Sequence, residues 1–263
     1  MGRRAFIFTG QGEGLDVENP QLVTFWMSVA LAKALIMNGE KPDALAGLSL
    51  GEFACYAIAG CLSVEELEQI LTFRQITTDE IFAKCDTGMI ACIGMKAENV
   101  RRIALKCQLE ITNYNAPMQV VVGGEKKNLK RFENDVLNSG CGRLVNLAVK
   151  GAFHSSYLDG ASKKMREYLE KYEIKKPAVP IYYDVTGDCE CENMSENIVE
   201  HLIRPVRFQE IIENMIKDGI EEFVSIGIGT TPVGLIWQIG KGMGVKIKVK
   251  KVESIDDVER VLK

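Results

Sequence analysis

Apolar residues along the chain fall into short continuous runs and into longer segments with helical spacing. The first run, residues 5–8, ends at the glycine-rich turn TGQGEG, and a helically spaced segment follows at about residues 22–37. A second run ends in GLSLGE around Ser49, and small and apolar residues continue after it as in a buried helix. Apolar strands that alternate with helices predict an α/β fold.

The pattern changes over residues 88–149. Its segments read in order as strand, helix, strand, strand, helix and strand: GMIACIGM, KAENVRRIALKC, LEITNYNA, MQVVVGG, KKNLKRFENDVLNSG and GRLVNLAV. This order is that of the ferredoxin-like βαββαβ unit. We therefore expect a small ferredoxin-like subdomain at residues 88–149, inserted into a large α/β catalytic subdomain made of residues 1–87 and 150–263.

Helix and strand patterns resume after the insert. A helix begins within residues 151–172, residues 179–185 read as a strand, and residues 195–219 are largely helical. Residues 221–229 form another apolar strand that enters a glycine turn. No repeat or low-complexity segment interrupts the chain, so the large subdomain and its insert account for the whole sequence.

The amino-acid composition indicates a substantial hydrophobic core and a small net charge. Hydrophobic residues make up 46% of the 263 residues, and the net charge is −4 with 26% charged residues. Nothing in this balance supports nucleic-acid binding through bulk charge, so an anionic partner would need a local basic patch.

The cysteines and the apolar segments bear on the cellular compartment. The eight cysteines are scattered, and the pair Cys189 and Cys191 lacks the spacing of a metal site, so we expect free thiols, no bound metal and a cytoplasmic protein. The first residues run directly into a strand and a glycine turn, unlike a signal peptide. The longest uncharged segment, residues 223–240, is interrupted by glycines and Pro232, so we expect no membrane span.

Ser49 is the first candidate for chemistry. It stands in Gly47-Leu48-Ser49-Leu50-Gly51, the Gly-x-Ser-x-Gly pattern of a nucleophile elbow, in which a strand turns sharply into a helix and exposes the serine oxygen. Taken alone, the pattern fits an ordinary strand-to-helix turn equally well.

A serine nucleophile needs a base within hydrogen-bonding reach, and the chain has only two histidines. His154 precedes a helix in GAFHSSYL, whereas His201 lies in the helical stretch IVEHLIRP, where a structural role is the more common one. The turn TGQGEG could present backbone N–H groups to an anion such as an oxyanion, but it lacks the lysine of a phosphate-binding loop.

Three motifs in this order resemble a known family. GQG near the start, GLSLGE next and AFHS after a ferredoxin-like insert are similar to malonyl-CoA:acyl carrier protein transacylases, which load malonyl units in fatty acid synthesis and have relatives in polyketide synthases. The resemblance covers nearly the whole chain. It implies an α/β-hydrolase-like large subdomain and a serine acyltransferase.

The resemblance implies a role for each matching residue. Ser49 would attack the thioester of malonyl-CoA, and His154 would take its proton and later return one to the leaving thiol. The backbone N–H groups of Gln11 and Leu50 would form the oxyanion hole. Arg74, in ILTFRQITTDE, would hold the malonyl carboxylate through paired hydrogen bonds.

Two further positions are assigned in the same way. Phe153 matches the form that the family associates with malonyl rather than methylmalonyl groups. The family's histidine is oriented by a backbone carbonyl just ahead of an x-Pro-Val segment, and the matching residue in EHLIRPVRF is His201. Its main chain would carry that role, so the side chain is free to differ.

The chain departs from the family in two places. Many relatives have a histidine where this chain has Leu48, so we expect altered packing under the elbow and a changed rate. The connection from Gln11 to Ser49 is short, with EGLDVENPQ crossing almost directly to the next helix, whereas most relatives carry additional helices there. Cover over the acyl-enzyme is therefore expected to be reduced.

The implied reaction is ping-pong transfer of a malonyl group from malonyl-CoA to the phosphopantetheine thiol of an acyl carrier protein, with no bound cofactor. Alternatives are a trans-acting acyltransferase of a polyketide synthase, a thioesterase or esterase that uses the same Ser-His pair, and a non-catalytic binding subunit. The oligomeric state is open, with a monomer as the starting expectation. Contacts to anionic CoA and carrier protein are expected from these basic residues: Lys163, Lys164, Arg166, Arg204, Arg207 and the lysines of GKGMGVKIKVKK.

Overall fold

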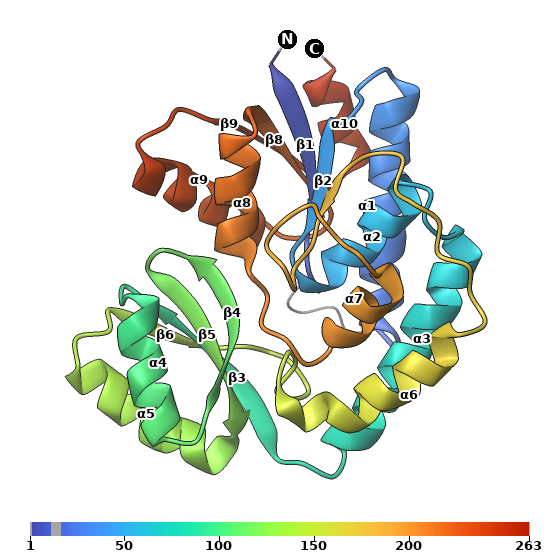
Figure 1. Cartoon of the computed structure of the whole chain (residues 1–263). Helices are drawn as coiled ribbons and strands as arrows, with labels where there is room; N and C mark the ends of the chain where they lie inside the picture. Colours follow the sequence, from blue (N-terminus) through green and yellow to red (C-terminus); the bar gives the residue numbers. More distant parts are fainter. Residues whose placement is uncertain (1, 12–16, 263) are drawn as a thin grey trace.

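The chain folds around two separate β-sheets (Figure 1). The computed structural model describes residues 2–11 and 17–262. The first sheet has five parallel strands in the order β7-β2-β1-β8-β9. Their bounds are β1 Arg3–Phe8, β2 Ala44–Gly47, β7 Ile181–Tyr182, β8 Ile220–Ile226 and β9 Lys248–Val252.

Helices cover both faces of this parallel sheet. One face packs against α1 Pro20–Met37, α2 Glu52–Ile58, α3 Val64–Phe82, α6 Asp159–Leu169, α7 Met194–Glu200 and α10 Ile255–Val261. The other face packs against α8 Phe208–Lys217 and α9 Thr231–Met243. Burial on both faces explains why the strands read as continuous apolar runs in the sequence.

Strand β1 shows how the sequence fills both cores. Successive side chains of a strand point to opposite faces. Phe6 and Phe8 accordingly join the cluster under α1 and α2, whereas Ala5 and Ile7 join the cluster under α8 and α9. All four side chains are fully buried. The α/β class predicted from the alternation of strands and helices is therefore confirmed.

Helix α1 is mostly apolar, with little difference between its faces. By length and composition alone it could cross a membrane, and it is the one helix among the described residues that passes this test. Phe25, Val29, Ala32 and Leu35 are nevertheless buried in the protein core, and the helix packs against α2, α3 and α10. The apolar side chains of this helix thus pack in the core beside the large sheet.

The second sheet forms the small unit, drawn in green in Figure 1. Its four antiparallel strands run in the order β4-β5-β3-β6, which is the order of a ferredoxin-like fold. The elements are β3 Thr87–Ile93, α4 Ala97–Lys106, β4 Glu110–Ala116, β5 Gln119–Glu125, α5 Lys126–Asn138 and β6 Arg143–Asn146. After β6 the chain returns to the parallel sheet through β7, so the βαββαβ unit expected from the sequence is present as an insertion.

The structure confirms or refines the other sequence expectations. The segment 195–219 is largely helical, as expected, and its helical residues form two helices, α7 and α8, on either side of Pro205, which cannot continue a helix. The strand expected at 179–185 pairs with β2 only at Ile181–Tyr182. The helix expected within 151–172 begins at Asp159, after a short 3-10 turn. Helices α9 and α10 and strand β9 were not predicted.

The turn after β2 depends on close backbone approaches. Ser49 has a positive φ of 56°, and a 3-10 turn, Ser49–Gly51, leads directly into α2. A Cβ on Gly47 would lie 1.9 Å from the backbone nitrogen of Glu52, and one on Gly51 would lie 2.3 Å from the carbonyl oxygen of Phe8. Only glycine at these two positions allows the strand, the turn and β1 to pack this closely.

We predict that Gly47→Ala destabilises the protein by about 1 to 3 kcal/mol, because the added methyl group would overlap backbone atoms that cannot move independently. Urea-induced unfolding measures the change. Gly234→Ala is the matched control, since a methyl group at this position of α9 would have no neighbouring segment within 4 Å and alanine favours helix by up to about 1 kcal/mol. Equal stability of Gly47→Ala and the wild type would contradict this account of the turn.

Candidate active site

A cavity of about 470 Å³ lies between the two units. The parallel sheet contributes the residues that follow β1, β2 and β8, so this wall is formed at the carboxyl ends of parallel strands, where α/β proteins commonly bind ligands. The antiparallel sheet contributes mainly apolar side chains from β3, β5 and β6 and two asparagines from β4. The cavity therefore joins a polar end to a largely apolar wall.

Ser49 and His154 meet in this cavity. The Ser49 Oγ lies 2.6 Å from the His154 Nε2, although the residues are 105 positions apart in the sequence. The His154 Nδ1 lies 2.8 Å from the main-chain oxygen of His201, which can only accept a hydrogen bond. Nδ1 therefore carries the proton, and Nε2 is left with a lone pair directed at the serine hydroxyl. This is the arrangement that proton removal from a serine requires.

Burial keeps His154 in its neutral form. The imidazole is 3% exposed, and burial lowers its pKa well below the usual value, with smaller contributions from His201 and Arg74. A neutral imidazole can accept a proton, so this shift favours a general base. His154 also has a positive φ of 58°, a conformation that favours glycine, so its backbone is held in an uncommon geometry.

Arg74 reaches the cavity from α3 as a buried charge. Its side chain is 3% exposed, and burial lowers its pKa to about 10, so it remains a cation at neutral pH. Nη1 donates a 2.5 Å hydrogen bond to the Gln21 Oε1, and the guanidinium lies 5.4 Å from the ring centre of Phe153. No carboxylate pairs with it in the described part of the chain.

An anion in the cavity would complete the bonding of this arginine. The Arg74 Nε is buried and has no hydrogen-bond partner among the described residues. A buried cation without a counterion is costly, and a guanidinium matches a carboxylate through two parallel bonds. Gln21 was missed in the sequence analysis, although a glutamine beside Pro20 at the start of an apolar helix is an unusual polar insertion.

Gln11 and Leu50 both line the cavity beside Ser49. Leu50 follows Ser49 in the 3-10 turn. The segment before Gln11 is drawn close to this turn, because a Cβ on Gly10 would lie 2.7 Å from the main-chain oxygen of Leu48. The structure thus brings together the two residues expected to supply oxyanion N–H groups. Residues 12–16 of the short connection to α1 lie outside the described residues.

Phe153 and Leu48 shape the apolar side of the site. Phe153 is half-buried, lines the cavity and packs edge-on against Phe82, with ring centres 4.9 Å apart. Leu48 is 8% exposed and belongs to the apolar cluster under α8 and α9. Its backbone N–H donates to the Phe8 oxygen at 2.9 Å, which fixes the turn against β1.

A fully buried polar cluster lies beneath Ser49. Glu52 accepts hydrogen bonds from the Tyr56 hydroxyl at 2.7 Å, the Asn197 amide at 2.8 Å and the Asp184 backbone N–H at 2.6 Å. Burial raises the pKa of Glu52 to about 7 and raises the pKa of Asp184 well above its usual value. The His201 side chain completes the cluster. None of these side-chain contacts was expected from the sequence.

This cluster offers three metal-ligand types, but its geometry is that of a hydrogen-bonded core. Ligand atoms of Glu52, Asp184 and His201 lie within 4.8 Å of one another. Both oxygens of Glu52 already accept bonds from neutral donors, and the His201 Nε2 already faces two protein oxygens. A bound cation would have to displace these hydrogen bonds, so the cluster acts as a hydrogen-bonded part of the protein core.

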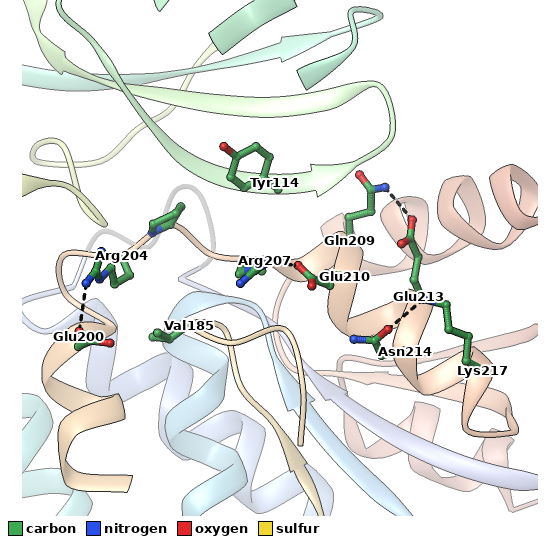
Figure 2. Close-up of a pocket in the computed structure, with 11 residues that line it drawn as sticks. Tyr114, Val185, Glu200, Arg204, Arg207, Gln209, Glu210, Glu213, Asn214 and Lys217 are labelled. Atoms are coloured by element: carbon green, nitrogen blue, oxygen red, sulfur yellow. Dashed lines mark hydrogen bonds and ion pairs between the residues drawn. The ribbon is translucent and has the colours of Figure 1, made fainter. Parts of the chain in front are cut away.

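A second and larger cavity, of about 760 Å³, lies on the other side of β4 (Figure 2). Tyr114 faces it, whereas its neighbours Asn113 and Asn115 face the Ser49 cavity, as expected for alternate residues of a strand. Arg204 and Arg207 line it and pair with Glu200 at 3.3 Å and Glu210 at 2.6 Å, and its remaining polar lining residues are Gln209, Glu213, Asn214 and Lys217.

Most basic residues expected to meet anionic partners are paired within the chain. Lys164 bonds Glu80 at 2.7 Å, and Arg166 pairs with Glu196. In the lysine-rich C-terminal segment, Lys250 approaches Glu222 at 3.6 Å, and Lys251 pairs with Glu253. Exposed pairs of this kind contribute little to stability and exchange readily, so these cations remain accessible to a stronger anion.

The arrangement defines a class of protein. A serine at a sharp strand-to-helix turn, a neutral histidine at hydrogen-bonding distance and a buried arginine in the same cavity are suited to acyl chemistry on an anionic substrate. Residues 7–232 match the family model described as the acyl transferase domain. The chain therefore belongs to the acyl transferase family and is an acyltransferase.

Individual relatives agree with this placement. The chain is 30% identical to the malonyl CoA-acyl carrier protein transacylase of Bacillus subtilis over 267 residues, covering 98% of this chain and 84% of that protein. It is 28% identical over 256 residues to the enzyme of the same name from Staphylococcus aureus, covering 95% of this chain and 81% of that protein.

Solved structures give the same result for the fold. The malonyl CoA-acyl carrier protein transacylase of Clostridium perfringens superposes with a TM-score of 0.90 at 27% identity, over 99% of this chain and 96% of that one. The acyl-carrier-protein S-malonyltransferase of Burkholderia pseudomallei superposes with a TM-score of 0.89 over 99% of both chains at 23% identity. The α/β architecture with a separate antiparallel sheet is shared with both.

We predict that the reactivity of Ser49 toward an uncharged fluorophosphonate stays constant from about pH 8 to about pH 6. An imidazole of ordinary pKa, about 6.5, would become protonated over this range and stop accepting the serine proton. Burial lowers the pKa of His154, so its neutral form persists to lower pH. The labelling rate measured by mass spectrometry tests this, with His154→Gln as the control that should label slowly at every pH. A midpoint near the ordinary histidine pKa would contradict it.

Proposed function

We propose that the protein transfers a malonyl group from malonyl-CoA to the phosphopantetheine thiol of an acyl carrier protein. The observation that carries this proposal is the 2.6 Å contact between Ser49 and His154 in a cavity that also holds the buried cation Arg74. The relatives named as malonyl CoA-acyl carrier protein transacylases support the choice of substrates.

The first half-reaction forms a malonyl ester on Ser49. The His154 Nε2 takes the hydroxyl proton as Oγ attacks the thioester carbon, and the carbonyl oxygen becomes an oxyanion that the backbone N–H groups of Gln11 and Leu50 stabilise. Collapse of this intermediate breaks the carbon–sulfur bond, and His154 gives its proton to the departing CoA thiolate. The main-chain oxygen of His201 accepts the hydrogen bond from Nδ1–H and keeps the ring oriented toward Ser49 in both its neutral and its protonated form.

The second half-reaction reverses these steps with a different thiol. The phosphopantetheine thiol gives its proton to His154 and attacks the ester carbon. Ser49 leaves as the alkoxide and regains a proton from His154, which yields malonyl-carrier protein and free enzyme. The resulting ping-pong scheme uses only groups of this chain, with CoA and phosphopantetheine as the carriers of the acyl group.

Selectivity for malonyl groups would come from Arg74 and Phe153. The malonyl carboxylate would pair with the guanidinium, whose Nε lacks a partner among the described residues. An acetyl group would leave this buried cation unpaired. The Phe153 ring, held by Phe82, limits the room for a substituent on the α-carbon. We also assign the protein to the cytoplasm, in agreement with its eight free cysteines.

Incubation with malonyl-CoA should increase the mass of the protein by one malonyl group, because the ester on Ser49 is an obligatory intermediate of the proposed scheme. Intact-protein mass spectrometry measures it, and Ser49→Ala should remain unmodified. Release of CoA beyond this first equivalent should depend on added acyl carrier protein. Continued CoA release without any carrier protein would indicate a thioesterase instead, and an unmodified wild-type protein would refute the proposal.

Arg74→Gln should lower kcat/KM for malonyl-CoA by about 30-fold or more. Losing one partner of a buried charge pair costs about 2 to 5 kcal/mol, and about 1.4 kcal/mol corresponds to a tenfold change. The same variant should use acetyl-CoA as well as or better than the wild type, because the uncompensated cation is gone. Arg101→Gln, an exposed position on α4, is the matched control. Unchanged selectivity in Arg74→Gln would refute the role of Arg74.

A further inference from the structure

The side chain of His201 lies directly beneath Ser49. The imidazole is buried, with 1% of the residue exposed, and it stands at the end of α7. Its Nε2 lies 3.1 Å from the Ser49 main-chain oxygen and 3.2 Å from the Asp184 Oδ2. The main-chain oxygen of the same residue accepts the bond from His154. A single residue thus contacts both members of the Ser-His pair, one through its side chain and the other through its backbone.

The surroundings of the imidazole select one tautomer. Nε2 faces two oxygens, and the carbonyl oxygen of Ser49 can act only as an acceptor. Nδ1 is buried and has no partner among the described residues. A proton on Nδ1 would therefore be an unsatisfied buried donor and would leave two lone pairs facing each other at Nε2 and Ser49. The Nε2–H tautomer avoids both penalties.

The hydrogen bond from His201 Nε2–H to the Ser49 carbonyl oxygen acts on a backbone in an unfavourable conformation. Ser49 is a non-glycine residue with a φ of 56°, and the left-handed conformation is unfavourable for such residues. The same Nε2 also contacts the Asp184 Oδ2. Asp184 is in turn fixed by the bond from its own N–H to Glu52. The buried imidazole that contacts the Ser49 carbonyl oxygen is therefore itself held in place by a fixed neighbour.

We propose that the His201 imidazole is a positioning residue for Ser49, whose Nε2–H bond to the Ser49 carbonyl oxygen holds the turn in the conformation that aims Oγ at His154. The proposal rests on the acyl-transfer function proposed above. It assigns a role to the His201 side chain in addition to that of its main chain, so a residue at this position must supply a side-chain donor as well as a carbonyl.

Burial keeps the imidazole neutral. Asp184 faces Nε2, the His154 and Phe53 rings pack edge-on against it at 5.1 and 5.6 Å, and Glu52 and the Arg74 cation lie nearby. Burial dominates and lowers the pKa of His201 to about 4. A neutral ring with one N–H can donate to Ser49 across the whole neutral range of pH.

The tautomer can be measured without any variant of His201. The chain has only two histidines, and the geometry requires opposite tautomers: Nδ1–H in His154 and Nε2–H in His201. Long-range ¹H–¹⁵N correlation spectra of the ¹⁵N-labelled protein distinguish the two forms, and His154→Gln assigns the signals by removing one set. A neutral Nδ1–H tautomer or a charged ring at His201 near pH 7 would overturn the proposal.

The functional test compares two substitutions of similar size. His201→Leu removes the donor and keeps the contact with Phe53, whereas His201→Gln retains an N–H that can reach the Ser49 oxygen. Labelling of Ser49 by an uncharged fluorophosphonate should slow by on the order of 10- to 100-fold in His201→Leu. His201→Gln should recover most of the loss. The KM for malonyl-CoA should change little in either variant, because the imidazole does not line the substrate cavity.

Each result supports or overturns the proposal. Wild-type labelling rates in His201→Leu, or an equal loss in both variants, would overturn it. If His201→Leu does not fold, as judged by thermal unfolding, the tautomer spectra of the wild type decide the matter. Labelling by fluorophosphonate does not involve malonyl-CoA, so a protein that ignores malonyl-CoA would refute the proposed function and leave the positioning role of His201 testable.

Discussion

The site depends on the hydrogen bond between Ser49 and His154, which joins two segments that both have left-handed backbone geometry. Neither conformation is favourable by itself, so the surrounding packing must impose both. Close contacts of Gly47 and Gly51 fix the serine turn, and the bond from Nδ1 to residue 201 fixes the histidine. The local strain of the site is thus offset by the parallel sheet and by the buried polar cluster below it.

Much of the fold followed from local sequence patterns. Residues 88–149 showed period and turn signals strong enough to give all six elements of the small unit, and the buried strands β1, β2 and β8 read as apolar runs. The largely helical character of residues 195–219 was also predicted, but the pattern did not give the two separate helices on either side of Pro205, because apolar spacing continues across it. Strand β7 was overestimated, since an apolar segment pairs only where a neighbouring strand is present.

The site was predictable only where a motif identified it. Ser49, His154 and Arg74 were assigned through resemblance, and the structure brings all three to one cavity. Gln21 and Asp184 belong to no motif, and Glu52, the last residue of GLSLGE, was given no role; the contacts that matter join these residues to others distant in sequence. Burial of these polar groups is a property of the assembled fold. No local pattern could show that Glu52 is fully enclosed or that Arg74 has glutamine for a neighbour.

Strand β4 ties the small unit to the two segments that carry His154 and His201. Thr112 and Tyr114 exchange backbone hydrogen bonds with Val206 at 2.9 and 2.8 Å, just five residues after His201. The Glu110 carboxylate also accepts a bond from the Ser156 backbone, two residues after His154. The edge of the inserted sheet is therefore attached to both segments that set the histidine geometry. A chimaera carrying the insert of another acyltransferase would need to reproduce the hydrogen bonds of this edge. The insert helps to position the active-site histidine, so it cannot be exchanged independently of the large subdomain.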